Sequence, residues 1–256
     1  MRRYRFLYEQ LVRRELRQKY QGSALGLAWY LVNPLVLMGA YYLLFGVLFP
    51  QTKVDDYPLF LIVGLVIWLF FSQSLLQAAD SLLAQGGLIR KARFPRETVP
   101  AAVVTVQLAT FLAVFALVAV VELAVRGTLG APLVLLPPLL VALFAFTLGL
   151  ALVVAVMHAY FRDVGPILSA VLLPWFFLSP IFYRPEDAAA GHEVAQDLLT
   201  WANPIAPFID AIRDVIYGGV WPSAATLLYV GAIAVVALAG GWALFRRMEG
   251  ELAVVV

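Results

Sequence analysis

Long uncharged apolar stretches alternate with short polar segments along the chain, and six of these stretches are long enough to cross a bilayer. None of the six contains Asp, Glu, Lys or Arg, and they cover residues 27–49, 57–79, 99–121, 132–157, 166–183 and 223–245. A hydrocarbon core of about 30 Å requires about 20 residues of helix. The two-residue alternation of barrel strands is weak. The pattern therefore predicts an all-α integral membrane protein, a single polytopic domain with six transmembrane helices.

The fifth stretch and the segment after it have the most irregular pattern. Pro174 and Pro180 fall inside the fifth stretch, and proline removes a helical hydrogen bond, so we expect a kink or an early end there. The segment 184–222 is too long for a tight connector. Its apolar residues follow a helical spacing that Pro204 and Pro207 interrupt. This predicts an extracytoplasmic loop with short helices that re-enter the membrane or lie on its surface.

Residues 5–20 precede the first predicted span and combine an apolar stripe with a basic surface. The apolar positions share the spacing of one helical face and are Tyr4, Leu7, Tyr8, Leu11, Val12, Leu16 and Tyr20. Mostly arginine occupies the remaining surface. A basic amphipathic helix of this kind is typical of the membrane–water interface. The alternative is a charge run whose only role is to fix the orientation of the protein.

The distribution of basic residues predicts the topology. Fourteen of the 18 Lys and Arg residues fall on one side of a six-span arrangement: they precede the first span, lie within 90–96, or stand at 162 and 246–247. Cytoplasmic segments carry the excess of basic residues in membrane proteins. We therefore expect both termini of this multi-pass protein to be cytoplasmic.

Composition supports the membrane assignment and excludes several chemistries. Of the 256 residues, 63% are hydrophobic and 13% are charged, roughly half the charged fraction of a soluble domain. The chain has no cysteine, which excludes disulfides and thiolate sites. Its two histidines, His158 and His192, are expected in loops on opposite sides of the membrane. Because no HExxH sequence occurs either, we expect no metal site.

The sequence also lacks the usual means of energising transport. No Gly-Lys dipeptide occurs, so there is no Walker A phosphate loop. We expect no enzymatic activity and no cofactor in this chain, and a partner must supply the energy if the chain is energised. Ion-coupled carriers usually need an ionisable group near the midplane. Asp80, Glu122 and Arg126 stand just beyond the predicted span ends, where we expect them to reach headgroups or water, so an ion-driven carrier is disfavoured.

Five stretches resemble, in order, those of permeases from ABC-type polysaccharide exporters, the family of O-antigen, teichoic acid and capsule export. They are LVRRELRQKYQGSALGLAWYLVNP at 11–34, LIRKARFP at 88–95, YFRD at 160–163, LSPIFY at 178–183 and NPIAPFIDAIR at 203–213. The resemblance implies a half-transporter in the bacterial cytoplasmic (inner) membrane. Two copies would pair, and two separate ATPase subunits, which would bind ATP and Mg²⁺, would dock beneath them. The substrate would be a glycan linked to polyprenyl diphosphate.

The same resemblance implies roles for individual residues. Contacts with the ATPase would come from the N-terminal helix and the second intracellular loop, through Arg5, Glu9, Arg13, Arg14, Arg17, Tyr160, Arg162 and Asp163. A gate near the lipid diphosphate would contain Arg90, Lys91, Arg93 and Phe94. Paired cations suit a diphosphate headgroup. The alternative for these cations is a purely topogenic role.

Aromatic residues near the span ends are candidates for a channel lining, because sugars stack their C–H faces on aromatic rings. The candidates are Tyr41, Tyr42, Trp175 and Phe176. Aromatic side chains also collect at membrane interfaces and face lipid, which is the alternative. Two other functions remain open at this point. They are an exporter of small lipids or drugs on the same scaffold, and a membrane anchor subunit of a glycan-synthesis complex.

Overall fold

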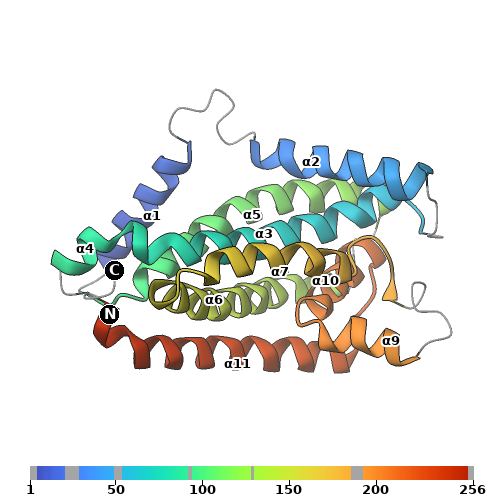
Figure 1. The fold of residues 1–256 in the computed structure, drawn as a ribbon. Coiled ribbons are helices and arrows are strands. Elements are labelled where there is room, and N and C mark those ends of the chain that lie inside the picture. Colours follow the sequence, from blue (N-terminus) through green and yellow to red (C-terminus); the bar gives the residue numbers. More distant parts are fainter. Residues whose placement is uncertain are drawn as a thin grey trace.

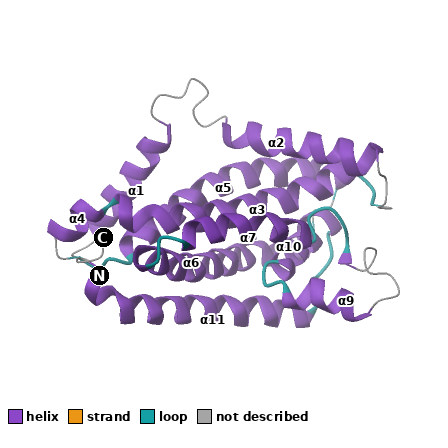
Figure 2. Cartoon of the chain, viewed as in Figure 1, coloured by secondary structure: helices purple, strands orange, loops and turns teal. Residues whose placement is uncertain are grey.

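The structure, a computed structural model, describes residues 5–20, 29–48, 54–91, 94–127, 130–185 and 193–252, and these residues form helices joined by turns, with no strand among them. The elements in chain order are α1 (Arg5–Tyr20), α2 (Trp29–Tyr41), η3 (Tyr42–Leu48), α3 (Tyr57–Ala84), α4 (Gly86–Lys91), α5 (Thr98–Arg126), η4 (Ala131–Leu135), α6 (Leu136–Tyr160), α7 (Val164–Leu178), α9 (Glu193–Asp197), η5 (Leu198–Ala202), α10 (Ala206–Arg213), η6 (Asp214–Gly218), α11 (Ala224–Met248) and η7 (Glu249–Glu251). Figure 2 shows how little of this part of the chain is loop.

The long helices run side by side in an elongated bundle, with α1 and α4 at one end and α9 and α10 towards the other (Figure 1). Four helices are long and apolar enough to cross a membrane: Tyr57–Ala84, Thr98–Arg126, Ala131–Tyr160 and Ala224–Met248. The other two predicted spans correspond to shorter apolar helices, Val32–Leu48 and Val164–Leu178. The all-helical prediction is therefore confirmed over the described residues.

Helix α3 is the centre of the bundle. In its most apolar window 78% of the residues are buried, against 17% in α11. A helix that is apolar all round is suited to such a position, and α3 packs against α2, α5, α6 and α7. Helix α11 lies at the edge and packs on α6. Its outer face carries exposed apolar side chains such as Leu228 and Val236, as expected of a surface turned towards lipid.

Helix α7 ends earlier than the predicted fifth span. The helix stops at Leu178, and Ser179 has extended backbone with φ −86° and ψ 145°. Pro180 follows, and the proline ring disfavours helical backbone in the residue before it. The early end predicted from the prolines is therefore confirmed, whereas the boundary at residue 183 is wrong.

Helix α5 runs further than the predicted third span, because Glu122 and Arg126 continue it instead of ending it. Glu122 is fully buried, so the expectation that it reaches headgroups or water is wrong. The apolar pattern marks only the part of a helix without charges. Glutamate and arginine are good helix formers, and nothing in their backbone preference ends the helix here.

The predicted short helices between the last two long segments are present. Helix α10 begins with Pro207 in its first turn, where the missing N–H has no helical partner to lose. Seven of its eight residues are buried. The helical run ends at Gly219, whose φ of 62° is left-handed, a conformation that glycine adopts without a side-chain clash.

A cluster of buried apolar side chains joins the ends of several helices at the α1 end of the bundle. It brings together Leu11, Leu82, Ile89, Val99, Ala102, Leu152, Ala155, Val156, Ala159, Phe245 and Leu252. These residues come from α1, α3, α4, α5, α6, α11 and the residue after η7. The basic segments of the chain therefore meet at one end of the molecule, as the charge distribution predicts.

Candidate functional site

Helix α1 packs its apolar stripe on the bundle itself. Leu11 is buried in the cluster at this end, and Leu7, Tyr8 and Val12 pack against it. The neighbour along most of the helix is α5. The stripe that predicts an amphipathic helix is therefore partly covered by protein. Phe6, on another face of the helix, is exposed.

Polar contacts fix the position of α1. The Arg14 guanidinium donates to Gln85 Oε1 at 3.0 Å, and the Gln85 amide donates to Glu15 Oε1 at 3.3 Å. The hydroxyls of Tyr8 and Thr105 share a hydrogen bond. Gln85 stands in the turn between α3 and α4, so a single side chain links α1 to that turn.

The remaining candidates on α1 differ in how far their side chains are exposed. Arg13 and Arg17 are exposed, and Glu9 is half-buried. The backbone of Arg5 begins the helix, and its side chain lies outside the described residues. Because Arg14 is engaged with Gln85, Arg13 and Arg17 are the cations of this group that α1 presents for a contact outside the chain.

Helix α4 places cations beside α1. Ile89 is buried in the apolar cluster, and Arg90 and Lys91 are exposed in the last turn. Basic residues there interact favourably with the carbonyl end of the helix, and their exposure leaves them able to bind an anion. Phe94 is half-buried and packs against the cluster. Arg93 lies outside the described residues.

The predicted loop 158–165 is shorter than expected, because α6 continues to Tyr160 and α7 begins at Val164. The expectation that His158 lies in a loop is therefore wrong. His158 is buried in the last turn of α6. Its Nδ1 accepts a hydrogen bond from the Gly165 amide at 3.0 Å, and its Nε2 lies 3.3 Å from Asp80 Oδ1. An accepting Nδ1 places the proton on Nε2, so the imidazole connects α3, α6 and α7. His192 lies outside the described residues.

Three candidates belong to this turn or to the end of α6 before it, where Tyr160 is half-buried. The Tyr160 hydroxyl donates to the Met248 carbonyl at 2.6 Å, which joins the end of α6 to the end of α11. Arg162 and Asp163 are exposed in the turn itself. The structure therefore brings α1, α4 and this turn to the same end of the bundle, although residues 20 and 160 are far apart in sequence.

The four candidate channel aromatics are not equivalent. Tyr41 and Phe176 contact each other, with ring centroids 5.6 Å apart, and Phe176 is buried in the protomer core. Trp175 contacts Trp68 on α3. Tyr42 is exposed and packs beside Tyr57. Tyr42 thus faces the surface of this single chain, whereas Phe176 does not.

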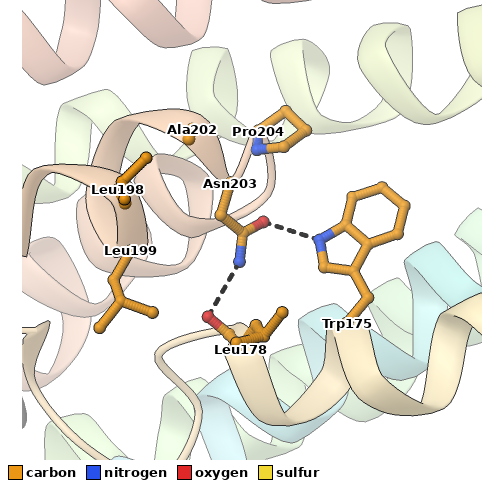
Figure 3. A pocket seen from close by; sticks show the side chains of 7 residues that line it. All are labelled: Trp175, Leu178, Leu198, Leu199, Ala202, Asn203 and Pro204. Carbon is orange, nitrogen blue, oxygen red and sulfur yellow. Dashed lines mark hydrogen bonds between the residues drawn. The ribbon is translucent and has the colours of Figure 1, made fainter. Parts of the chain in front are cut away.

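Trp175 lines a cavity of about 420 Å³ at the far end of α7 (Figure 3). Its indole Nε1 donates to Asn203 Oδ1 at 2.8 Å, and the Asn203 amide donates to the Leu178 carbonyl at 3.2 Å and to Ser179 Oγ at 3.0 Å. Leu198, Leu199 and other apolar residues form the rest of the wall. Since the Asn203 side chain is already engaged, the cavity offers mainly an indole ring and apolar surface.

A buried charged cluster, which the sequence analysis missed, lies towards the same end. The Arg213 guanidinium is buried, donates to the Pro180 carbonyl at 2.8 Å and lies 3.6 Å from the Phe60 ring centroid. Burial lowers the pKa of Arg213 to about 10, and the nearby Asp210 opposes that shift, so Arg213 stays charged at neutral pH. A Cβ on Gly64 would lie 2.6 Å from Arg213 Nη2. Gly64 therefore makes room for this cation.

Glu122 and Arg126 extend this cluster on α5. Arg126 forms an ion pair with Asp56 at 2.7 Å and donates to the Tyr217 carbonyl at 2.9 Å. Neither carboxylate oxygen of Glu122 has a hydrogen-bond partner within the described part of the chain.

A sequence signal did exist for Arg213, since it is the only basic residue in an apolar stretch that includes α10. Nothing in the sequence pairs it with Phe60 or Pro180.

No group of three or more His, Cys, Asp or Glu residues that could hold a metal ion is found within the described ranges. The arrangement offers exposed cations at one end and an aromatic and charged cluster at the other.

Comparisons with known proteins identify the family of the chain. The chain is 32% identical over 250 residues to the O-antigen export system permease protein RfbA of Myxococcus xanthus, which covers 98% of this chain and 95% of that protein. A protein of the same name from Klebsiella pneumoniae is 26% identical over 263 residues, covering 97% and 95%. The polysialic acid transport protein KpsM of Escherichia coli is 26% identical over 250 residues, covering 94% and 93%. The model of the family described as ABC-2 type transporter matches residues 7–217. The chain therefore belongs to the ABC-2 type transporter family.

Proposed function

We propose that this chain is the membrane permease subunit of an ABC transporter that exports a polysaccharide linked to polyprenyl diphosphate across the bacterial cytoplasmic membrane. The observation that carries the proposal is the similarity over nearly the whole chain to permeases named for O-antigen export and for polysialic acid transport. We place O-antigen first among the glycans because two of these three relatives carry that name. Teichoic acid and capsule are the next candidates.

The proposed orientation places the α1 end in the cytoplasm with both termini. The basic segments meet there, and basic segments stay on the cytoplasmic side of membranes. In this arrangement all six apolar helical segments cross the membrane, with α2 and η3 forming the first span and α7 the fifth. The segment with α9 and α10 then lies on the outer side and closes the exit of the pore.

The proposed partner at the cytoplasmic end is a pair of separate ATP-binding subunits. Arg13 and Arg17 on α1 and the turn with Arg162 and Asp163 present exposed charges on neighbouring surfaces. Charges of this kind favour encounter with a complementary protein surface. The chain itself contains no Walker A sequence, so hydrolysis belongs to the partner and this chain transmits its motion.

The proposed contact with the lipid diphosphate is made by α4. Arg90 and Lys91 are exposed at its end, and Arg93 follows in the sequence. Guanidinium and ammonium groups bind phosphate oxygens with charge-assisted hydrogen bonds. The glycan would then pass between two copies of the chain, along aromatic surfaces that include Tyr42 and Trp175.

Conditional depletion of the protein, followed by mass spectrometry of polyprenyl-linked glycans, tests this function. Accumulation of one lipid-linked polymer inside the cell is the expected result and would name the substrate. Normal surface glycan without accumulation would favour an exporter of small lipids or drugs. Stimulation of the partner's ATP hydrolysis by the purified chain separates a transporter from an anchor subunit of a synthesis complex, because an anchor need not stimulate it.

A further inference from the structure

An apolar groove opens between α5, α6 and α11, away from α2 and α7. It has a volume of about 450 Å³, and its lining includes Ala101, Leu148, Leu152, Leu238, Ala239 and Trp242. This volume is within the range of small-molecule sites. Its walls are parts of three helices that are long and apolar enough to cross a membrane, so its apolar lining suits a hydrocarbon chain.

One end of the groove carries an ion pair. Glu97, which lines the groove, precedes the first turn of α5. Its Oε1 accepts a hydrogen bond from the Arg246 guanidinium at 2.8 Å. Its Oε2 is buried and has no hydrogen-bond partner among the residues that the structure describes. A buried carboxylate oxygen without a donor is costly, so a cation that reaches the Glu97 carboxylate from the groove would be stabilised.

The same end of the groove has the features of a membrane interface. Arg246 is about half exposed, and its guanidinium carbon lies 5.2 Å from the centroid of the Trp242 ring. Tryptophan and arginine gather at the level of lipid headgroups. Glu97 and Arg246 also lie at the end of the bundle that holds the α1 cluster, because Val99 and Phe245 belong to that cluster.

We propose that this groove binds a membrane phospholipid with a zwitterionic headgroup that carries a primary ammonium, as in phosphatidylethanolamine. The acyl chain lies along the apolar wall between α5 and α11. The phosphate binds Arg246, and the ammonium donates to the Glu97 carboxylate. A zwitterion complements an ion pair because each of its charges meets the opposite one.

The charges around the mouth favour a zwitterion over an anionic lipid. Arg246 is already within salt-bridge distance of two carboxylates, Glu97 at 2.8 Å and Glu249 at 3.4 Å. Burial first, and then the charge of Glu97, raise the pKa of Glu249 above its usual value, although Arg246 and Arg96 oppose this shift. An added anion would meet these carboxylates without an ammonium to offset them. The site is independent of the exported substrate and does not rest on the proposed function.

Native mass spectrometry of the purified full-length chain tests the site. The protein is delipidated and titrated separately with palmitoyl-oleoyl phosphatidylethanolamine and with palmitoyl-oleoyl phosphatidylglycerol. We expect one tightly held phosphatidylethanolamine per chain, bound several-fold more tightly than phosphatidylglycerol. Equal or tighter binding of phosphatidylglycerol would overturn the headgroup assignment.

Two variants locate the lipid. Ala239→Trp fills the groove and is expected to abolish the tight binding, whereas Ala232→Trp adds the same side chain to an exposed position of α11 that does not line the groove and should leave it intact. Retained binding in Ala239→Trp would overturn the location. Glu97→Gln, which needs no new space, is expected to remove the preference for phosphatidylethanolamine. If Ala239→Trp does not fold, an unchanged preference in Glu97→Gln still overturns the proposal.

Discussion

Gly149 on α6 and Gly241 on α11 bring two helical backbones into direct contact. A Cβ built on Gly241 would lie 2.1 Å from the Gly149 carbonyl oxygen, and a Cβ on Gly149 would lie 2.2 Å from the Ala237 carbonyl oxygen. Helices in a membrane gain little from hydrophobic burial and associate through close packing at small residues. This contact therefore holds α11, the most peripheral long helix, on the bundle.

Gly241→Ala is expected to destabilise the protein, because the new methyl group must push the two backbones apart. Overpacking of this kind costs about 1–3 kcal/mol. A Cβ on the neighbouring Gly240 would meet no atom within 4 Å, so Gly240→Ala is a matched control. Thermal unfolding in detergent should show a lower Tm for Gly241→Ala alone. The same Tm for both variants would contradict the close approach of the helices.

Arg213 is expected to hold the end of α7 against α10. Arg213→Met removes its hydrogen bonds to the Pro180 and Ile181 carbonyls, and a hydrogen bond to a charged group contributes about 1.5–3 kcal/mol. We expect a lower Tm and faster hydrogen exchange in the turn after α7. Arg184→Met is the control, since the Arg184 guanidinium lies farther from the Phe60 centroid, at 5.9 Å, than the Arg213 guanidinium at 3.6 Å. Equal effects of the two variants would show that charge alone matters.

The cations of α1 are expected to have separate roles. Arg13→Glu with Arg17→Glu changes two exposed residues and should weaken binding of the ATPase subunit by at least about tenfold, or about 1.4 kcal/mol, without lowering the Tm. Arg14→Ala removes the bond to Gln85 and should lower the Tm by loosening α1. Co-purification and thermal unfolding measure the two effects. Full binding of the ATPase by a folded double variant would rule out α1 as the docking surface.

His158 is expected to stabilise the turn between α6 and α7. His158→Ala leaves the Gly165 amide without its acceptor, and an unsatisfied buried donor costs about 1–3 kcal/mol. Asp80 is 78% exposed, so Asp80→Asn should change stability little. Chemical unfolding of both variants measures the difference. A loss in Asp80→Asn as large as that in His158→Ala would mean that the contact between Asp80 and His158 provides the stability.

The cations of α4 are expected to bind phosphate. Arg90→Gln with Lys91→Gln should weaken binding of a polyprenyl diphosphate several-fold and reduce its dependence on salt, because two charge-assisted contacts are lost. Arg247→Gln removes an exposed cation at the same end and serves as the control. Mass spectrometry of the bound lipid measures the effect. If the double variant instead inserts with inverted topology, the topogenic role of these residues is supported.

Local sequence determines where the helices lie and which of their ends carry the basic residues. Apolar stretches between charged segments predict where the long helices lie, because a polar backbone in lipid must bond within its own helix. The prolines near residues 174–180 predict the early end of α7 for a purely local steric reason. The basic segments predict which helix ends meet, and the apolar cluster around Leu11 agrees.

The contacts between distant residues appear only in the tertiary structure. The apolar stripe of α1 predicts an interface helix, but only packing shows that Leu11 is buried against protein. The sequence predicts that Glu122 stands just beyond a span end and reaches headgroups or water. It is instead buried, because α5 continues past it and other helices cover it. The pairing of Gly149 with Gly241, the space that Gly64 leaves for Arg213, and the groove beside Glu97 each join residues far apart in the chain. Hydropathy and helical spacing report one helix at a time, whereas these contacts depend on how the helices pack together.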